Sequence, residues 1–148
     1  MVNAKVKGTR GETELKSAFY DQIGFYLVRN PDQTRKGGYD CSIRYDDDLD
    51  SPIAIPFAIE FKRNESLSTL AMWKQALGQV TKSCFIPVVA YRRNRCPWEF
   101  IVPWAIIKGV DGPYCPEFEG TAILHSPQFF EVAREWVDVK ANLITKGK

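Results

Sequence analysis

Apolar side chains recur along the chain with two periods, and these periods predict its secondary structure. Helical spacing marks three segments: residues 7–24, a stretch from Ser66 or Ser68 to about Lys82, and residues 126–144. Alternating or continuous apolar runs mark five strands, at residues 25–29, 39–45, 53–62, 85–93 and 98–103. This order predicts an α/β domain in which a central, mixed five-stranded sheet is flanked by helices. Residues 103–119 show no regular pattern.

Local signals mark the ends of the first and last helices. Thr9 and Glu12 have the spacing of a capping box, which predicts that the helix starts at Thr9. Gly24 is expected to end this helix. Ser126 and Pro127 fit the N-cap and the first position of the last helix.

The composition is that of one folded domain. The chain has 148 residues, of which 45% are hydrophobic and 26% are charged. We expect a single domain with a core at about residues 7–103 and a C-terminal helical extension at about residues 104–148. The first ten residues lack the apolar region of a signal peptide, and no apolar run is long enough to span a bilayer. These features predict a soluble, cytoplasmic protein with no membrane partner.

Charge is distributed unevenly along the chain. Residues 1–39 carry seven Lys or Arg against four Asp or Glu, and residues 61–108 carry eight against two. Residues 40–60 between them carry one against six. An acidic segment between two basic ones is consistent with a metal-binding centre beside an anion-binding surface, or with a solvated acidic turn.

The stretch "FAIEFKRNE" places an acid and a base inside an apolar run. Glu60 and Lys62 point to the same face of a strand, where the simplest interpretation is a salt bridge. Asp40 is expected on the neighbouring strand, so that two carboxylates would meet in a partly buried site. Such a pair stays ionised only beside a cation, and Mg²⁺ or Mn²⁺ is the natural one for oxygen ligands. Lys62 would then orient a water or neutralise phosphate charge, which is the chemistry of phosphodiester hydrolysis.

The order of these motifs resembles the PD-(D/E)xK nuclease superfamily, and within it the archaeal and phage-type Holliday junction resolvases. The matching stretches are "KGTRGETEL", "GFYLVRN", "GGYD", "IEFK" and "IPVVAYRRNRCPWEFIVP", which together span about residues 7–103. One departure is Tyr39, which stands where the superfamily often has proline. The resemblance implies a restriction-endonuclease-like core, and it assigns Glu12, the first Glu of the first helix, to the active site.

The resemblance also implies roles for single residues and for partners. Asp40, Glu60 and the Phe61 carbonyl would bind the metal, Glu12 would bind the metal or its water, and Lys62 would orient the nucleophile. A Gln on the second helix often faces the metal site in related enzymes, which points to Gln75 or to Gln79, one turn further on. A four-way junction needs two symmetric nicks, and a two-fold homodimer with one site per subunit, which the resemblance also implies, satisfies that geometry. The last helix, with Phe129, Phe130 and Trp136, is a candidate for its interface.

Basic residues in the flanking segments are candidates for phosphate contacts, which position DNA without reading its sequence. They are Lys5, Lys7, Arg10, Arg35, Lys36, Arg92, Arg93 and Arg95. We therefore predict a single nuclease domain that cuts branched DNA with Mg²⁺, or with Mn²⁺ in its place, and without a small-molecule cofactor. Two alternatives remain at this point: another nuclease of the same superfamily, with flap, mismatch or restriction-type activity, and a DNA-binding module without catalysis.

Overall fold

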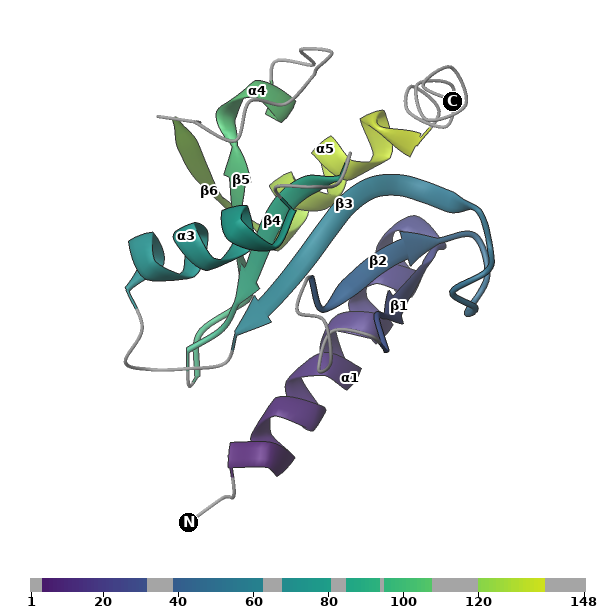
Figure 1. Ribbon diagram of the computed structural model, residues 1–148, viewed down its shortest axis with the longest axis horizontal. Coiled ribbons are helices and arrows are strands. Elements are labelled where there is room, and N and C mark those ends of the chain that lie inside the picture. Colours follow the sequence, from purple (N-terminus) through teal and green to yellow (C-terminus); the bar gives the residue numbers. More distant parts are fainter. Residues whose placement is uncertain are drawn as a thin grey trace.

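A six-stranded mixed sheet forms the centre of the protein, with helices on both faces (Figure 1). The computed structural model describes residues 4–31, 39–62, 68–80, 85–93, 95–107 and 120–137, with side chains from residue 10 onward. The helices are α1 (Ala4–Ile23), α3 (Thr69–Val80), α4 (Trp104–Ile107) and α5 (Ser126–Glu135). The strands are β1 (Tyr26–Arg29), β2 (Cys41–Arg44), β3 (Ile53–Lys62), β4 (Ile86–Tyr91), β5 (Glu99–Pro103) and β6 (Thr121–His125).

The strands lie in the sheet in the order in which they occur in the sequence, from β1 to β6. Every neighbouring pair is antiparallel except β3 and β4, which are parallel. A parallel pair needs a crossover connection, and α3 lies within this connection. The predicted mixed α/β class is therefore confirmed.

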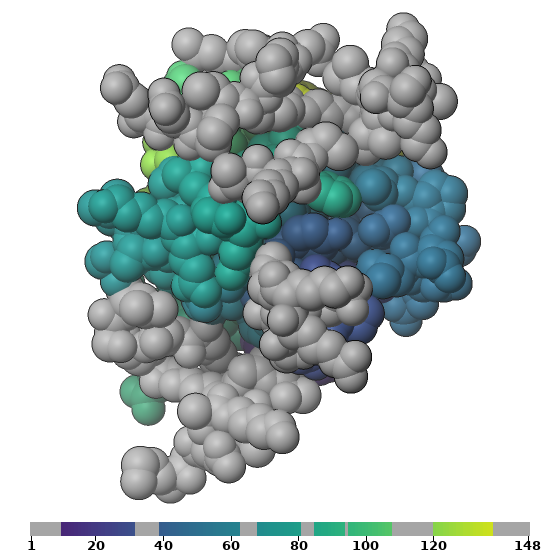
Figure 2. Space-filling view, viewed as in Figure 1, coloured from purple at the N-terminus to yellow at the C-terminus, as the bar shows by residue number. Residues whose placement is uncertain are grey.

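The two faces of the sheet have different covers. On one face α1 and α5 pack over the larger core, where Leu15, Phe19, Phe129 and Phe130 are almost fully buried. On the other face Met72, Trp73 and Ala76 of α3 pack over β4 and β5. Figure 2 views this second face, with α3 in teal beside the blue segment of residues 39–62. Figure 1 shows α3 in front of the sheet and α1 behind it.

Several predicted boundaries are wrong, and each error has a local cause. The first helix begins at Ala4, so Thr9 lies inside it and cannot be its N-cap. Its capping-box spacing is incidental, because Thr and Glu are both tolerated in a helix interior. The strand predicted at residues 39–45 is limited to Cys41–Arg44, which leaves Asp40 just before β2.

Within the part of the chain that the structure describes, the sheet has six strands, whereas the sequence pattern predicted five. The missed strand, β6, pairs antiparallel with β5 along its whole length. Its side chains alternate between exposed and half-buried positions, as expected for an edge strand. A short helix, α4, also lies in the segment that showed no regular pattern.

The C-terminal part of the described chain contributes to the core. The rings of Phe100 and Phe129 stack with centroids 3.9 Å apart. The Trp136 indole is buried and donates a hydrogen bond to the Ile106 carbonyl at 3.0 Å. The suggestion that Phe129, Phe130 and Trp136 form a dimer surface is therefore wrong, because all three face the protein's own core. No helix in the described ranges is long and apolar enough to cross a membrane.

Candidate active site

Two carboxylates meet beside β3, just before β2 begins. The last residue pair of the β2–β3 ladder is Cys41 with Ile59, so Asp40 lies opposite Glu60 in the next position. The Phe61 backbone N–H donates to Asp40 Oδ2 at 3.0 Å. The strand β2 does not extend far enough to supply a backbone acceptor for the Phe61 N–H. The Asp40 carboxylate is the acceptor instead. Asp40 was predicted on the strand beside Glu60; it lies one residue before that strand, and its carboxyl group still reaches β3 at Phe61.

Lys62 and Gln75 both contact the Glu60 carboxylate. Lys62 Nζ lies 3.1 Å from Glu60 Oε1, and the two side chains are 23% and 3% exposed. Because Lys62 lies two residues beyond Glu60 on β3, both side chains leave the same face of the sheet. Gln75 of α3 donates from Nε2 to Glu60 Oε1 at 3.5 Å. The predicted salt bridge is present, and an amide from α3 reaches the same carboxylate.

Burial raises the pKa values of both carboxyl groups. The pKa of Glu60 rises to about 7, first through burial and then through the negative charge of Asp40, while Lys62 partly opposes the rise. The pKa of Asp40 is also raised by burial, although the Phe61 N–H and Lys62 lower it. A hydrogen bond between the two carboxyl groups raises the pKa of Glu60 and lowers that of Asp40. The pair of carboxyl groups therefore tends to hold a proton near pH 7. A bound cation could take the place of that proton.

Glu12 lies on α1, the helix that covers the sheet face opposite α3. It is half-buried on α1, and its charge raises the pKa values of Asp40 and of the neighbouring Cys41 thiol. Within the described residues, no three Asp, Glu, His or Cys side chains come together as ligands of one ion. The assignment of Glu12 as a metal ligand therefore stays a prediction.

The donor set at this site suits Mg²⁺. This ion is commonly held by one or two carboxylates, with water and substrate phosphate at the other positions. Asp40 and Glu60 supply two carboxylates. The Phe61 carbonyl is on the same side of β3 as its N–H, because both groups of one strand residue point the same way. The carbonyl thus lies on the side of β3 that faces Asp40.

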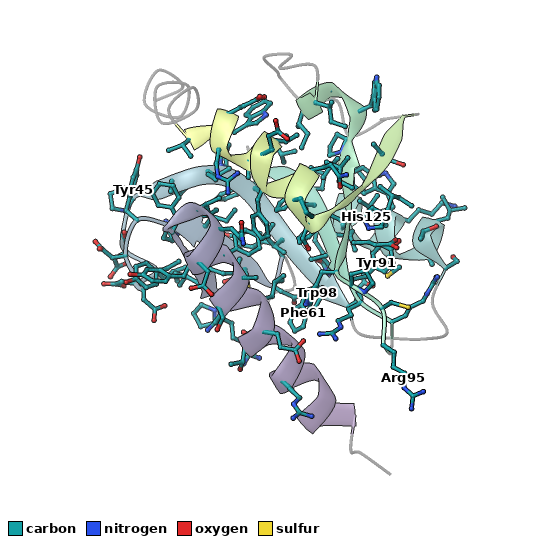
Figure 3. All side chains as sticks on the ribbon, turned by 180° about the vertical axis from the view of Figure 1, so that it is seen from behind. Tyr45, Phe61, Tyr91, Arg95, Trp98 and His125 are labelled. Carbon is teal, nitrogen blue, oxygen red and sulfur yellow. The ribbon has the colours of Figure 1, made fainter. Side chains whose placement is uncertain are left out.

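The basic candidates fall into three groups. Arg10, Arg93 and Arg95 are exposed, and Arg95 points away from the body of the protein (Figure 3). Arg92 instead pairs with Glu14. The others are Lys5 and Lys7, whose side chains lie outside the described part, and Arg35 and Lys36, which lie outside the described residues altogether. Phosphate binding by all eight stays a prediction.

Sequence reasoning missed a polar pair beside Lys62. Tyr91 of β4 is the register partner of Lys62, and its hydroxyl donates a hydrogen bond to Glu99 of β5. Burial and Glu99 raise the pKa of Tyr91 to about 12, so the phenol keeps its proton at neutral pH. The Arg93 guanidinium carbon lies 5.8 Å from the centre of the Tyr91 ring. Alternation along β4 could have placed Tyr91 on the Lys62 face, but its partner on β5 has no sequence signal.

Comparison with known proteins finds likeness in structure but none in sequence. No protein-family model matches the chain, and no curated protein matches its sequence. A solved structure of Archaeoglobus fulgidus Hjc, a Holliday junction resolvase from an archaeal hyperthermophile, aligns with a TM-score of 0.45 and 16% sequence identity. The alignment covers 93% of this chain and 98% of that chain. A likeness of this size assigns neither a family nor an activity, so the function is argued from the site.

Proposed function

We propose that this protein is a divalent-cation-dependent endonuclease that hydrolyses phosphodiester bonds in branched DNA, most simply in four-way junctions. One observation carries the proposal: the buried Glu60 carboxyl group and the half-buried Asp40 carboxyl group meet beside Lys62. A salt bridge between Glu60 and Lys62 needs no second acid. Asp40 opposite Glu60 adds repulsion, which a structural ion pair would avoid and a bound cation would relieve.

Asp40, Glu60 and the Phe61 carbonyl would hold Mg²⁺ or Mn²⁺, with Glu12 as a further ligand or a partner of its water. When bound, such an ion polarises a phosphoryl oxygen and lowers the pKa of a water molecule. The protein's part is to fix the donors in place. The Phe61 N–H holds one oxygen of Asp40, and Gln75 and Lys62 both contact Oε1 of Glu60.

Lys62 is placed to act on the reacting groups. Its ammonium contacts the buried Glu60, yet the side chain remains 23% exposed and so can reach a substrate from the protein surface. A charge in this position can orient an attacking water, and it can stabilise negative charge that develops on the phosphate. Gln75 would help to fix the orientation of Glu60.

The choice of branched DNA rests on the sequence resemblance to junction resolvases together with three exposed arginines. Arg10, Arg93 and Arg95 are exposed and could bind phosphates. A four-way junction needs two symmetric nicks, which a homodimer with one site per subunit would supply. Flap, mismatch or restriction-type cutting would use the same chemistry on another DNA shape, and substrate shape is read by the surface rather than by the site.

Cleavage of a labelled four-way junction, beside duplex, flap and single-stranded DNA of matched sequence, tests this proposal. The assay is run with Mg²⁺, with Mn²⁺ and with chelator, using the wild type and Asp40→Asn. We expect paired nicks in the junction that disappear with chelator and in the variant. Equal cutting of flap or duplex would keep the nuclease and remove the junction specificity. Binding without cutting under every condition would leave a DNA-binding module and refute the catalytic proposal.

A further inference from the structure

Arg92 joins three parts of the fold at the end of the sheet that carries the site. Its backbone N–H donates to the Lys62 carbonyl at 3.0 Å. Its Nε donates to the Cys96 carbonyl at 2.9 Å, and its Nη1 donates to Glu14 Oε2 at 2.5 Å. The end of β3, the β4–β5 connection and α1 therefore all contact one residue.

The position of Glu14 on α1 determines how the contact with Arg92 affects the orientation of the helix. Leu15 is fully buried and marks the side of α1 that faces the sheet. Glu12 and Glu14 are two residues apart, so they leave the helix axis about 200° apart and lie on opposite flanks of Leu15. The Glu12 flank faces Asp40 and Cys41, whose pKa values the Glu12 charge raises. The Glu14 flank faces Arg92. A contact at Glu14 therefore opposes rotation of α1 about its axis, which would move Glu12.

The Arg92 guanidinium is already held by protein acceptors and is not free to bind a phosphate. Two of its nitrogens have acceptors on different elements, one in α1 and one after β4. The Arg92 and Glu14 side chains are 28% and 35% exposed, so the pair is partly shielded from water. To bind a DNA phosphate, Arg92 would have to release Glu14. The exposed Arg93 and Arg95 have no such acid partner among the described contacts.

We propose that Arg92 and Glu14 are positioning residues that hold α1, and with it Glu12, against the strand end that carries Lys62. This inference rests on the proposed nuclease function, in which Glu12 and Lys62 serve one reaction. Phe61 and Trp98 pack at the same end of the sheet, with ring centroids 6.4 Å apart, and the two labels lie beside α1 in Figure 3. The ion pair thus connects α1 to the residue after β4, while the Phe61–Trp98 contact connects β3 to the residues before β5.

The two possible roles of Arg92 predict opposite results for Glu14→Gln. If Arg92 binds phosphate and Glu14 restrains it, loss of the acid frees a cation and tightens DNA binding. If the pair positions α1, loss of the acid slows cleavage and leaves DNA affinity unchanged. The salt dependence of binding separates the roles further, because loss of one phosphate contact lowers the slope of log K against log salt by about 1.

The test compares Glu14→Gln, Arg92→Gln, the double variant and Arg92→Lys with the wild type. Glu135→Gln is the matched control, because Glu135 is exposed on α5 far along the chain. Arg93→Gln serves as the comparator for a phosphate contact. We expect both single variants to reduce the single-turnover cleavage rate by about 10- to 100-fold. The double variant should be no slower than the worse single one, and Arg92→Lys should recover part of the rate. Affinity and salt slope, measured in chelator, should match the wild type.

Hydrogen exchange gives a readout that does not depend on cleavage. Protection of the α1 amides around residues 12–19 should fall in Glu14→Gln and Arg92→Gln, while protection in α3 stays unchanged. Unchanged α1 protection in both variants would overturn the inference, as would a lower salt slope in Arg92→Gln or tighter binding by Glu14→Gln. If the wild type cuts no DNA, the nuclease proposal fails, and hydrogen exchange still decides whether the pair holds α1.

Discussion

Replacing Glu60 by Gln should stabilise the metal-free protein at alkaline pH while it removes activity. The Glu60 side chain is 3% exposed, and burial together with Asp40 raises its pKa to about 7. The folded state thus disfavours the ionised form. This penalty is absent well below the ordinary pKa of 4.5, where Glu60 is protonated in both states, and it is complete above pH 7.

The magnitude follows from the pKa difference. A rise from 4.5 to about 7 corresponds to about 3 kcal/mol at pH 8.5, at about 1.4 kcal/mol per pH unit. Loss of the ion pair with the partly exposed Lys62 returns up to about 1 kcal/mol. We therefore expect Glu60→Gln to gain about 2 kcal/mol at pH 8.5, or about 4–8 °C in Tm for a chain of this size. At pH 5 the gain should be below about 1 kcal/mol.

Urea unfolding in chelator at pH 5 and pH 8.5 measures this difference. Asp47→Asn is the matched control, because it removes one negative charge from an exposed position and should change stability by less than about 0.5 kcal/mol. Added Mn²⁺ should stabilise the wild type more than Glu60→Gln at pH 8.5. A variant that is no more stable than the wild type at pH 8.5, or whose gain is the same at both pH values, would refute this account of the carboxylate pair.

Three further predictions test other parts of the structure. Lys62→Ala should slow cleavage by at least about 100-fold with DNA affinity unchanged. The control Lys74→Ala, on the exposed side of α3, should cut at the wild-type rate. Wild-type cutting by Lys62→Ala would remove Lys62 from the mechanism. Phe129→Ala should lower the free energy of unfolding in urea by about 3–5 kcal/mol. This fully buried ring packs on four others, Phe19, Phe57, Phe100 and Phe130. A decrease below about 1 kcal/mol would show that α5 is not part of the core. Tyr91→Phe removes the hydroxyl that binds Glu99 and should cost about 1 kcal/mol; an unchanged unfolding midpoint would contradict the importance of that bond.

The centre of the site was predictable because it depends on short-range rules. Side chains two apart on a strand share a face, so the neighbouring positions of Glu60 and Lys62 could be read directly from "IEFK". The position of Asp40 needed only one further step, since the acidic turn before Pro52 joins two adjacent antiparallel strands.

The parts that were missed depend on weak or distant signals. β6 is a five-residue edge strand with only Ala122 and Leu124 turned to the core, which is too short an alternation to outweigh the irregular residues before it. Glu14 and Arg92 are 78 residues apart, and no local pattern pairs an acid on a helix with a base at the end of a strand. The predicted start of the first helix is wrong for the opposite reason. The local signal at Thr9 is clear, but the helix already begins at Ala4.

Calorimetric titration of Mn²⁺ into the metal-free protein tests the central claim most directly. Experiments at pH 7 in two buffers of different ionisation enthalpy report both binding and proton release. The account predicts one saturable site that releases about half a proton at pH 7, because Glu60 has a pKa of about 7, and almost none at pH 9. Asp40→Asn should abolish this site, and Asp47→Asn in the exposed acidic turn should leave it unchanged. Absence of saturable binding, or equal binding by Asp40→Asn, would contradict a metal centre at Asp40 and Glu60.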